Sequence, residues 1–596
     1  MTAAKVMTPY ERAVAKVDSF LAAAPTIARK LPQSPNTWQL LVDHCLLKNK
    51  PVMLKLPQNF PFTPARIYVD ASLFLELPHV EHDGRLCLAD TSSPDDYEHP
   101  ADAVFRVIQN FQESWFPLCQ DPCRVEREFQ KESLSYWSNY CGVQERRIGR
   151  ALATTHTHVQ LRPLENWSEG AVAAFVHKGQ GDRKLVRQIA TLVGEEPYKV
   201  AARHKWNTGT FVRGKALFLP LPSTIAWTPK TWPKTLFELE SLVANLTGGA
   251  VDLLSWIQQG VHPQNQAHSI DALGHSLLAD RGACPPLVIF IRDSVPYCYQ
   301  LAPSSILKRK GLSVVPRLCS RIDASWALTR DHAPEPFHQR QLKRVLVIGC
   351  GSLGSPVAEL LARAGVGHLD IIDNEYFEEP NISRHVLGLS SRGQSKAEAL
   401  EARISREIPE ISITGIREDV SRWVAQEDAR ARFDLIVECS GESKVRTVVS
   451  QWRSQTFGNT PVLHAWLEPF CSAAHAVLTL IDDPWPSSDP ADEKVNAASF
   501  SGFDVRVDLP ACGVGFHPYG AADVWQAAAF ATERILSILD GQCSQATVWS
   551  WVRAKAFYDG LPVMGEIPLR AIVPREGSRY DSVMRTRAYR AVMSAS

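Results

Sequence analysis

The pattern of apolar residues changes near residue 344, where short apolar runs begin to alternate with amphipathic helical stretches. In the runs 344–350, 368–374 and 434–441 a polar first residue is followed by mainly apolar residues, which is typical of strands buried on both faces of a parallel sheet. Helical periodicity follows over 355–365 and 393–408. This order predicts βαβ units and therefore a Rossmann-like α/β domain.

The first 145 residues follow a different pattern. An amphipathic helical stretch comes first, and strand-like runs follow at 51–57 and 65–77. Two further helical stretches are expected over 101–115 and 124–137. Strands followed by helices, without regular alternation, predict a small α+β domain.

The rest of the chain divides into a middle domain, a linker and the α/β domain. Residues 146–328 mix short strands and helices and are expected to form an α/β middle domain without a chemical motif. The polar, proline-containing stretch 329–342 is predicted to be a linker. The α/β domain then covers 343–596; we expect a long helix over 521–541 and closing strands over 547–560 and 565–574.

Composition limits the classes of function. The chain has 596 residues, enough for three or four domains, and its 64 basic and 64 acidic residues give no net charge. A nucleic-acid binder that works through bulk charge is therefore not expected. No apolar run is long enough for a membrane span, and no signal-peptide pattern begins the chain. The 13 scattered cysteines, without any C-x-x-C pair, favour reduced thiols in a cytoplasm.

A glycine-rich loop marks a nucleotide site. Gly349, Gly351 and Gly354 come directly after a predicted strand and directly before a predicted helix. Such a loop lets the backbone approach phosphate, and the helix N-terminus favours negative charge. Asp373 ends the next strand, 19 residues after Gly354, where a carboxylate can meet a ribose hydroxyl. These residues alone would also suit a dinucleotide-dependent dehydrogenase.

The polar residues that follow favour ATP over a dinucleotide. Asn381, Arg384 and Lys396 come after Asp373, and together the two cations suit a triphosphate. This set resembles the adenylating domain of ubiquitin-activating enzymes and of the bacterial proteins that activate sulfur carriers. The resemblance implies that ATP and Mg²⁺ are bound and that the C-terminal carboxylate of a partner is adenylated. It places Asp373 at the ribose and Asn381, Arg384 and Lys396 at the phosphates.

Two positions depart from that family pattern. Glu375 stands where the family has a second Asp. Gly441, in "ECSGESKVR", stands where the family has a magnesium-binding Asp. The neighbouring Glu442 is therefore predicted to supply the metal-binding carboxylate.

An acyl adenylate is commonly passed to a thiol, and the chain offers a late candidate. Cys512 lies between Pro510 and Gly513 in a predicted loop just before the long helix, where a thiolate is favoured. Cys350 and Cys439 are expected to be structural because they lie in the phosphate loop and on an apolar strand. Cys543 competes with Cys512 for the role of nucleophile.

A second cysteine station is predicted near the N-terminus. The segment "LPHVEHDGRLCL", 77–88, resembles the active-site strip of ubiquitin-conjugating domains, with Cys87 at the thioester position. The resemblance covers about 140 residues. His79 stands where the family has an oxyanion-stabilising Asn, and a histidine can donate a hydrogen bond there. His82 is a further nearby candidate for polarising the site.

The order conjugating domain, middle domain, adenylating domain resembles the bacterial ubiquitin-transferase-like fusions of CBASS anti-phage operons. The resemblance implies activation of the C-terminus of a cGAS-like nucleotidyltransferase (CD-NTase), with thioesters on Cys512 and then Cys87. The acyl group then passes to an amine of a target protein. It also implies a homodimer through the adenylating domain.

Three other functions stay open at the level of sequence. A sulfur-carrier activator would need no conjugating cysteine. A non-catalytic scaffold would follow if the residues at His79 and Gly441 marked inactive sites. Plain NAD-dependent reduction would need only the glycine loop and Asp373.

Overall fold

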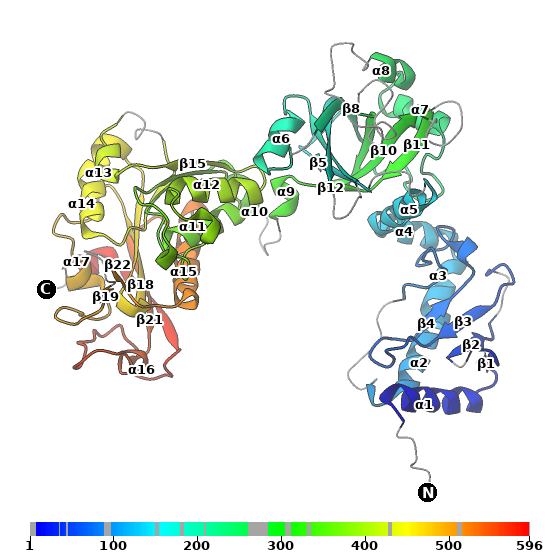
Figure 1. Cartoon of the computed structure of the whole chain (residues 1–596), viewed down its shortest axis with the longest axis horizontal. Coiled ribbons are helices and arrows are strands. Elements are labelled where there is room, and N and C mark those ends of the chain that lie inside the picture. Colours follow the sequence, from blue (N-terminus) through cyan, green and yellow to red (C-terminus); the bar gives the residue numbers. More distant parts are fainter. Residues whose placement is uncertain are drawn as a thin grey trace, which may run out of the picture. The chain divides into compact units, whose positions relative to one another are not determined.

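The computed structural model describes residues 7–34, 36–42, 46–88, 97–148, 154–178, 184–207, 210–259, 284–303, 312–329, 335–426, 432–508 and 515–594. The chain forms two compact units (Figure 1). The first comprises Met1–Ala202 and Trp206–Arg321, and the second comprises Arg203–Lys205 and Ile322–Ser596.

The first unit begins with a four-stranded antiparallel sheet in the order β1-β2-β3-β4. Alternate strand residues point to one face, so Trp38, Leu54 and Ile67 share the core. Thr8 caps the first helix in a capping box with Glu11. The elements are β1 (Ala28–Lys30), β2 (Thr37–Leu40), β3 (Val52–Lys55), β4 (Arg66–Tyr68), α1 (Pro9–Ala23), α2 (Pro100–Gln109), α3 (Phe116–Gln120), α4 (Pro122–Lys131) and α5 (Ser133–Ile148).

The middle of the chain forms a mixed eight-stranded sheet in the order β11-β10-β9-β8-β6-β7-β5-β12. Helices α4 and α5 contribute to its core, in which Trp137 packs edge-on against Trp232 and Tyr299. The elements are β5 (Thr154–Gln160), β6 (Ser168–Lys178), β7 (Lys184–Leu192), β8 (Thr210–Pro220), β9 (Leu287–Arg292), β10 (Val295–Pro303), β11 (Leu312–Arg317), β12 (Cys319–Arg321), α6 (Pro197–Arg203), α7 (Leu236–Leu246) and α8 (Leu253–Gln259).

The second unit contains an eight-stranded sheet in the order β15-β14-β13-β16-β17-β18-β21-β22, parallel from β15 to β17 and antiparallel beyond. The predicted βαβ units are confirmed. The elements are β13 (Arg344–Ile348), β14 (His368–Ile372), β15 (Ser412–Ile416), β16 (Leu435–Glu438), β17 (Val462–Leu467), β18 (Ala473–Thr479), β21 (Thr547–Arg553), β22 (Ser582–Ala588), α11 (Gly354–Arg363), α12 (Lys396–Glu407), α13 (Val420–Trp423), α14 (Ser443–Trp452) and α15 (Ala521–Leu539).

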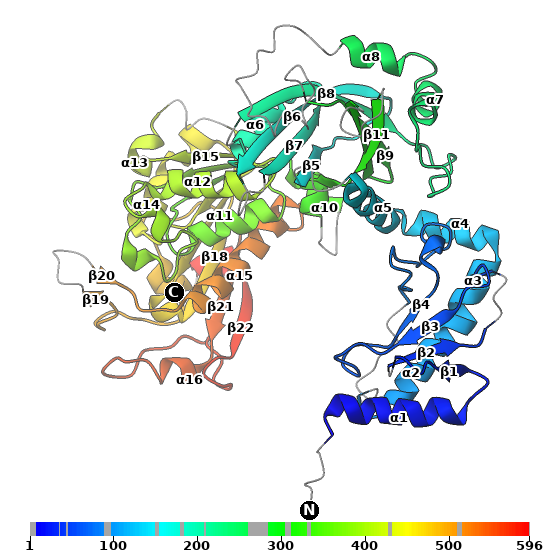
Figure 2. The same ribbon diagram turned by 45° about the vertical axis from the view of Figure 1, so that its right-hand side comes forward.

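Helices cover both faces of the parallel strands (Figures 1 and 2). Val345 and Val347 of β13 pack with α11, α12 and α15, whereas Leu346 and Ile348 pack with α13 and α14. The strand order reverses at β13, so the carboxyl ends of β13, β14 and β16 open a crevice at one edge of the sheet. Ligands of open α/β sheets bind at this kind of position.

Two local expectations differ from the structure. The predicted strand over 565–574 is wrong, because within it only Leu569 makes an isolated bridge. The sheet ends with β21, which occupies the first half of the predicted strand over 547–560, and with β22. Part of the predicted linker is helical, because α10 (Glu335–Arg340) buries Phe337 and pairs Arg340 with Asp540 at 2.6 Å. Among the described residues no helix is long and apolar enough to cross a membrane.

Candidate functional site

The glycine loop connects β13 to α11. Gly349 has φ +88°, and a Cβ built there would lie 2.8 Å from the backbone of Ser440. A Cβ on Gly354 would lie 1.8 Å from the carbonyl oxygen of Gly349. These two positions therefore require glycine for the fold of the loop itself. A Cβ on Gly351 would meet nothing within 4 Å, so at this position glycine leaves open space in front of the loop.

Asp373 follows β14 and joins the loop to the crevice. Its carboxylate accepts hydrogen bonds from the N–H groups of Cys350 at 2.7 Å and Glu375 at 2.8 Å. Burial raises the pKa of Asp373. Its two oxygens keep lone pairs for a ligand hydroxyl, since a carboxylate accepts about four hydrogen bonds.

The crevice at this edge of the sheet forms a pocket. The pocket is lined by Ile348, Gly349, Gly351, Ser352, Ile372, Asp373, Asn374, Glu375, Glu418, Asp419, Val420, Cys439, Ser440, Glu442 and Val445.

Glu375 and Lys396 form a pair beside this pocket. The Lys396 ammonium, 6% exposed, contacts the Glu375 carboxylate, and the Lys396 N–H donates to the carbonyl of Glu375 at 3.0 Å. Lys396 is the first residue of α12. Lys396 is not among the residues that line the pocket, but its partner Glu375 is.

The predicted metal ligand Glu442 lies on a turn anchored in the core. Buried Glu438 accepts hydrogen bonds from the N–H of Ser440 at 2.8 Å and from its hydroxyl at 2.5 Å. On its other side Glu438 faces His464 at 3.2 Å. Gly441 has φ +75°, so the turn uses the left-handed conformation that glycine favours.

The acidic lining suits a hard cation. Burial raises the pKa of Glu442, and the nearby carboxylates Glu375, Glu438 and Asp419 raise it further. A divalent cation would relieve this repulsion, and oxygen donors are those that Mg²⁺ prefers. The residues present therefore fit Mg²⁺ held by Glu442 with a neighbouring carboxylate.

Asn381 and Arg384 lie on the segment after β14. The Asn381 side chain accepts from the N–H of Glu378 at 3.0 Å, which closes a short 3₁₀ turn over Glu379–Asn381. The residue after Arg384 is His385, and no role was predicted for it from the sequence. Its Nε2 lies 2.6 Å from the carbonyl oxygen of Cys350. Its Nδ1 accepts from the N–H of Leu387 at 3.0 Å, so Nε2 holds the proton.

Arg384 itself contacts two aromatic rings. Its guanidinium is 5.5 Å from the ring centre of Phe516 and 5.3 Å from that of Tyr519. The Tyr519 hydroxyl is 2.8 Å from the Ser352 hydroxyl in the glycine loop. These aromatic residues follow position 512 closely in the chain, whereas Cys512 lies outside the described residues.

The other cysteines of this unit separate by burial. Cys350 and Cys439 are buried, and burial raises the pKa of each thiol well above its ordinary value. A thiol held neutral is a poor nucleophile, which agrees with their predicted structural role. Cys543 is half-buried and contacts the carbonyl of Gln545 at 3.6 Å.

Cys87 is exposed on a strip beside β4. The N–H of Leu86 donates to the carbonyl of Ile67 at 2.8 Å, which attaches the strip to the sheet. The N–H of Cys87 donates to the carbonyl of His79, also at 2.8 Å. His79 has φ +61°, and His82 is exposed. The strip therefore presents the thiol to solvent next to the residue at the expected Asn position.

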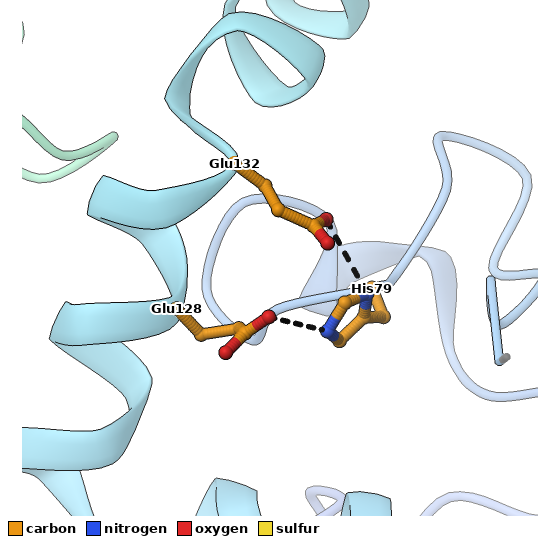
Figure 3. A group of neighbouring side chains, drawn as sticks. All are labelled: His79, Glu128 and Glu132. Carbon is orange, nitrogen blue, oxygen red and sulfur yellow. Dashed lines mark ion pairs between the residues drawn. The ribbon is translucent and has the colours of Figure 1, made fainter. Parts of the chain in front are cut away.

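The His79 imidazole lies between two carboxylates of the helical region (Figure 3). Nε2 is 3.4 Å from Glu128, and Nδ1 is 3.7 Å from Glu132. Within the described residues this is the one group of three side chains with metal-ligand geometry. One ligand atom from each of the three residues lies within 4.8 Å of the other two, although the two ion-pair contacts involve different ring nitrogens.

The fold and the site together define an α/β domain with an acidic crevice at the carboxyl ends of its parallel strands. Residues 333–514 match the ThiF family, so the chain contains a ThiF-family domain. The expected likeness to ubiquitin-transferase-like proteins is also confirmed. Over 252 residues the chain is 30% identical to the ATP-dependent ubiquitin transferase-like protein Cap2 of Vibrio cholerae, covering 40% of this chain and 41% of that protein.

The chain also matches a shorter stretch of another curated protein and a solved structure. The chain is 35% identical over 122 residues to the adenylyltransferase and sulfurtransferase MOCS3 of Bos taurus, covering 20% of this chain and 27% of that protein. Among solved structures, E. coli MccB with MccA-N7isoASN has 17% identity and a TM-score of 0.30, covering 41% of this chain and 68% of that one. The chain thus matches less than half the length of these two curated relatives.

Proposed function

We propose that this protein uses ATP to adenylate the C-terminal carboxylate of a partner protein. The observation that carries the proposal is the pocket at the carboxyl ends of β13, β14 and β16, where the glycine loop meets Asp373 within a ThiF-family domain. Asp373 would accept hydrogen bonds from the ribose. The open space before Gly351 would admit phosphate oxygens.

The cations around the pocket are proposed to serve the triphosphate. Arg384 would contact the phosphates, either by moving away from its aromatic neighbours or by moving together with them. Asn381 would hold the segment that carries Arg384 in place. Lys396 would reach them by exchanging its contact with Glu375. When bound through Glu442, Mg²⁺ would neutralise charge on the triphosphate.

The acyl group is proposed to move next through two thioesters. Cys512 would attack the adenylate carbonyl and release AMP. Cys87 would then attack that thioester, and an amine of a target protein would finally attack the Cys87 thioester. The exposed position of Cys87 supports its role, since a station for transthioesterification must be reachable. His79 would assist at this second station.

The partner is proposed to be a cGAS-like nucleotidyltransferase of a CBASS operon, with its C-terminus as the carrier. The likeness to Cap2 proteins supports this choice. We further propose a homodimer formed through the adenylating domain. Transfer to a target amine would then prime anti-phage signalling in the bacterial cytoplasm.

The match to MOCS3 favours one alternative, a sulfur-carrier adenylyltransferase. In that case the adenylate would be converted to a thiocarboxylate, and Cys87 would have no part. Mass analysis of the carrier C-terminus separates the products: an isopeptide bond supports conjugation, and a thiocarboxylate supports sulfur transfer.

ATP–pyrophosphate exchange tests the adenylation step. Labelled pyrophosphate is expected to enter ATP only when a peptide from the nucleotidyltransferase C-terminus is present. Arg384→Ala should reduce this exchange at saturating peptide. Exchange that does not depend on any carrier peptide, or its absence at all concentrations, would refute adenylation.

A further inference from the structure

We propose that His79, Glu128 and Glu132 form an acceptor-amine site, in which the carboxylates bind an incoming ammonium group and His79 takes its proton. This inference rests on the proposed transfer from Cys87. It assigns the binding of a primary amine, cationic before reaction, to a cluster of three residues. The segment 77–88 contains only one of them, His79.

Charge is the first argument. With His79 protonated, the three side chains carry a net charge of −1, and with His79 neutral they carry −2. Lys131 is the nearest counter-charge that contacts the cluster, at 3.5 Å from Glu128, but it is 72% exposed and therefore largely solvated. A half-buried anionic cluster attracts a lysine ammonium.

Neither carboxylate makes a hydrogen bond of ordinary length to the imidazole. The ring nitrogens of His79 lie 3.4 and 3.7 Å from their carboxylates, and an N–H···O hydrogen bond is about 2.7–3.2 Å long. A neutral imidazole has one nitrogen without a proton, and that nitrogen faces an oxygen that can only accept. An ammonium, which carries three N–H donors, satisfies both acceptors.

The cluster is held next to the thioester position by backbone contacts. His79 accepts from the N–H of Cys87 at 2.8 Å and donates its own N–H to the Tyr136 hydroxyl at 3.1 Å. The His79 and Tyr136 rings also meet edge-to-face, with their centres 6.4 Å apart. Tyr136 is therefore a positioning residue that links the strip to the cluster.

The transfer step balances with these groups. The ammonium gives one proton to His79, and its nitrogen becomes a nucleophile. That nitrogen bonds to the thioester carbonyl carbon, the C–S bond breaks, and its electron pair leaves on Cys87 Sγ. The nitrogen's second proton goes to the departing thiolate, and His79 releases its proton to water.

The test bypasses adenylation by loading cysteines of the full chain with glycylglycine from its 2-mercaptoethanesulfonate thioester. Peptide mass spectrometry then follows loss of the acyl group from Cys87, with exposed Cys123 in the same chain as an internal reference. Two nucleophiles are compared at pH 7.5: free lysine, which is cationic, and hydroxylamine, which is neutral. Glu126→Gln is the matched control because Glu126 is exposed on the same helix, α4.

We expect lysine to discharge wild-type Cys87 faster than Cys123. Glu128→Gln and Glu132→Gln should slow this reaction about tenfold each, and His79→Gln about a hundredfold, as for loss of a proton-transfer group. Hydroxylamine discharge should change less than about twofold, and Glu126→Gln should match wild type.

If the His79, Glu128 and Glu132 variants slow discharge by lysine and by hydroxylamine equally, the cluster has only a structural role. Glutamate variants that behave like Glu126→Gln would overturn the acceptor site while leaving transfer from Cys87 intact. Wild-type discharge by lysine no faster at Cys87 than at Cys123 would overturn both the acceptor site and the proposed transfer step.

Discussion

His385 donates from Nε2 to the carbonyl oxygen of Cys350 at 2.6 Å. This single hydrogen bond connects the segment of Arg384 to the glycine loop, across 35 residues of sequence. Because the ring is buried and Nδ1 accepts from Leu387, the geometry holds only for the neutral imidazole. Two predicted ligand-binding segments thus depend on one uncharged side chain.

The first prediction concerns the pH dependence of stability. Burial lowers the pKa of His385 to about 4, below its ordinary value of 6.5. The unfolded state therefore binds more protons between these values, so stability present above pH 6.5 is lost as the pH falls toward 4. The loss is about 3 kcal/mol at most. His385→Gln should show a smaller decline of Tm between pH 7 and pH 5 than wild type. Parallel Tm curves would contradict this assignment.

The second prediction compares two glycines of the same loop. Gly354→Ala should distort the loop and lower Tm, because the new Cβ would meet the carbonyl of Gly349. Gly351→Ala should keep a Tm near wild type but weaken ATP binding, by about tenfold if the Cβ displaces one phosphate contact worth ~1.4 kcal/mol. Thermal unfolding and calorimetric titration with ATP measure the two effects. Unchanged ATP affinity in Gly351→Ala would place the phosphates elsewhere.

The third prediction concerns the metal ligand. Glu442→Gln should raise the Mg²⁺ concentration needed for half-maximal ATP binding about tenfold, comparable to the loss of one metal-shell group. Gly441→Asp in the same chain should recover part of this loss, because Asp tolerates a positive φ better than most residues and no atom lies within 4 Å of the new Cβ. A Mg²⁺ titration of ATP binding provides the measurement. If Glu442→Gln titrates like wild type, another carboxylate of the lining holds the ion.

The fourth prediction separates charge from shape at Arg384. Arg384→Lys keeps the charge but loses the planar group that lies over the rings of Phe516 and Tyr519. It should weaken ATP binding nearly as much as Arg384→Ala. Tyr519→Phe keeps the ring and removes only the hydroxyl contact with Ser352, so it serves as the matched control with a smaller effect. Wild-type affinity in Arg384→Lys would show that charge alone is sufficient.

Sequence patterns predicted the α/β domain well because its signals are local. Continuous apolar runs, intervening helices and the spacing from Gly354 to Asp373 each depend on residues close in the chain. The same local reasoning fails at 565–574, where an apolar, proline-containing stretch resembles a strand but makes no ladder.

The contacts that complete the candidate sites depend on tertiary structure. Glu128 and Glu132 come about 50 residues after His79 and show no motif, so only the packing of α4 against the strip brings them together. His385 likewise belongs to no sequence motif, and only the fold brings it into contact with the glycine loop. The likeness of residues 1–145 to a ubiquitin-conjugating domain, the predicted domain boundaries and the site roles stay predictions.

The most direct test of the central claim follows the acyl group itself. The chain is co-expressed with a cGAS-like nucleotidyltransferase, as wild type, Cys87→Ala and Cys512→Ala, and products are separated on reducing and non-reducing gels. We predict reductant-resistant conjugates of the nucleotidyltransferase in wild type alone. Cys87→Ala should retain a reductant-sensitive adduct on Cys512, and Cys512→Ala should carry no adduct on either cysteine. Conjugates that persist in Cys87→Ala, or an adduct on Cys87 without Cys512, would contradict the proposed relay.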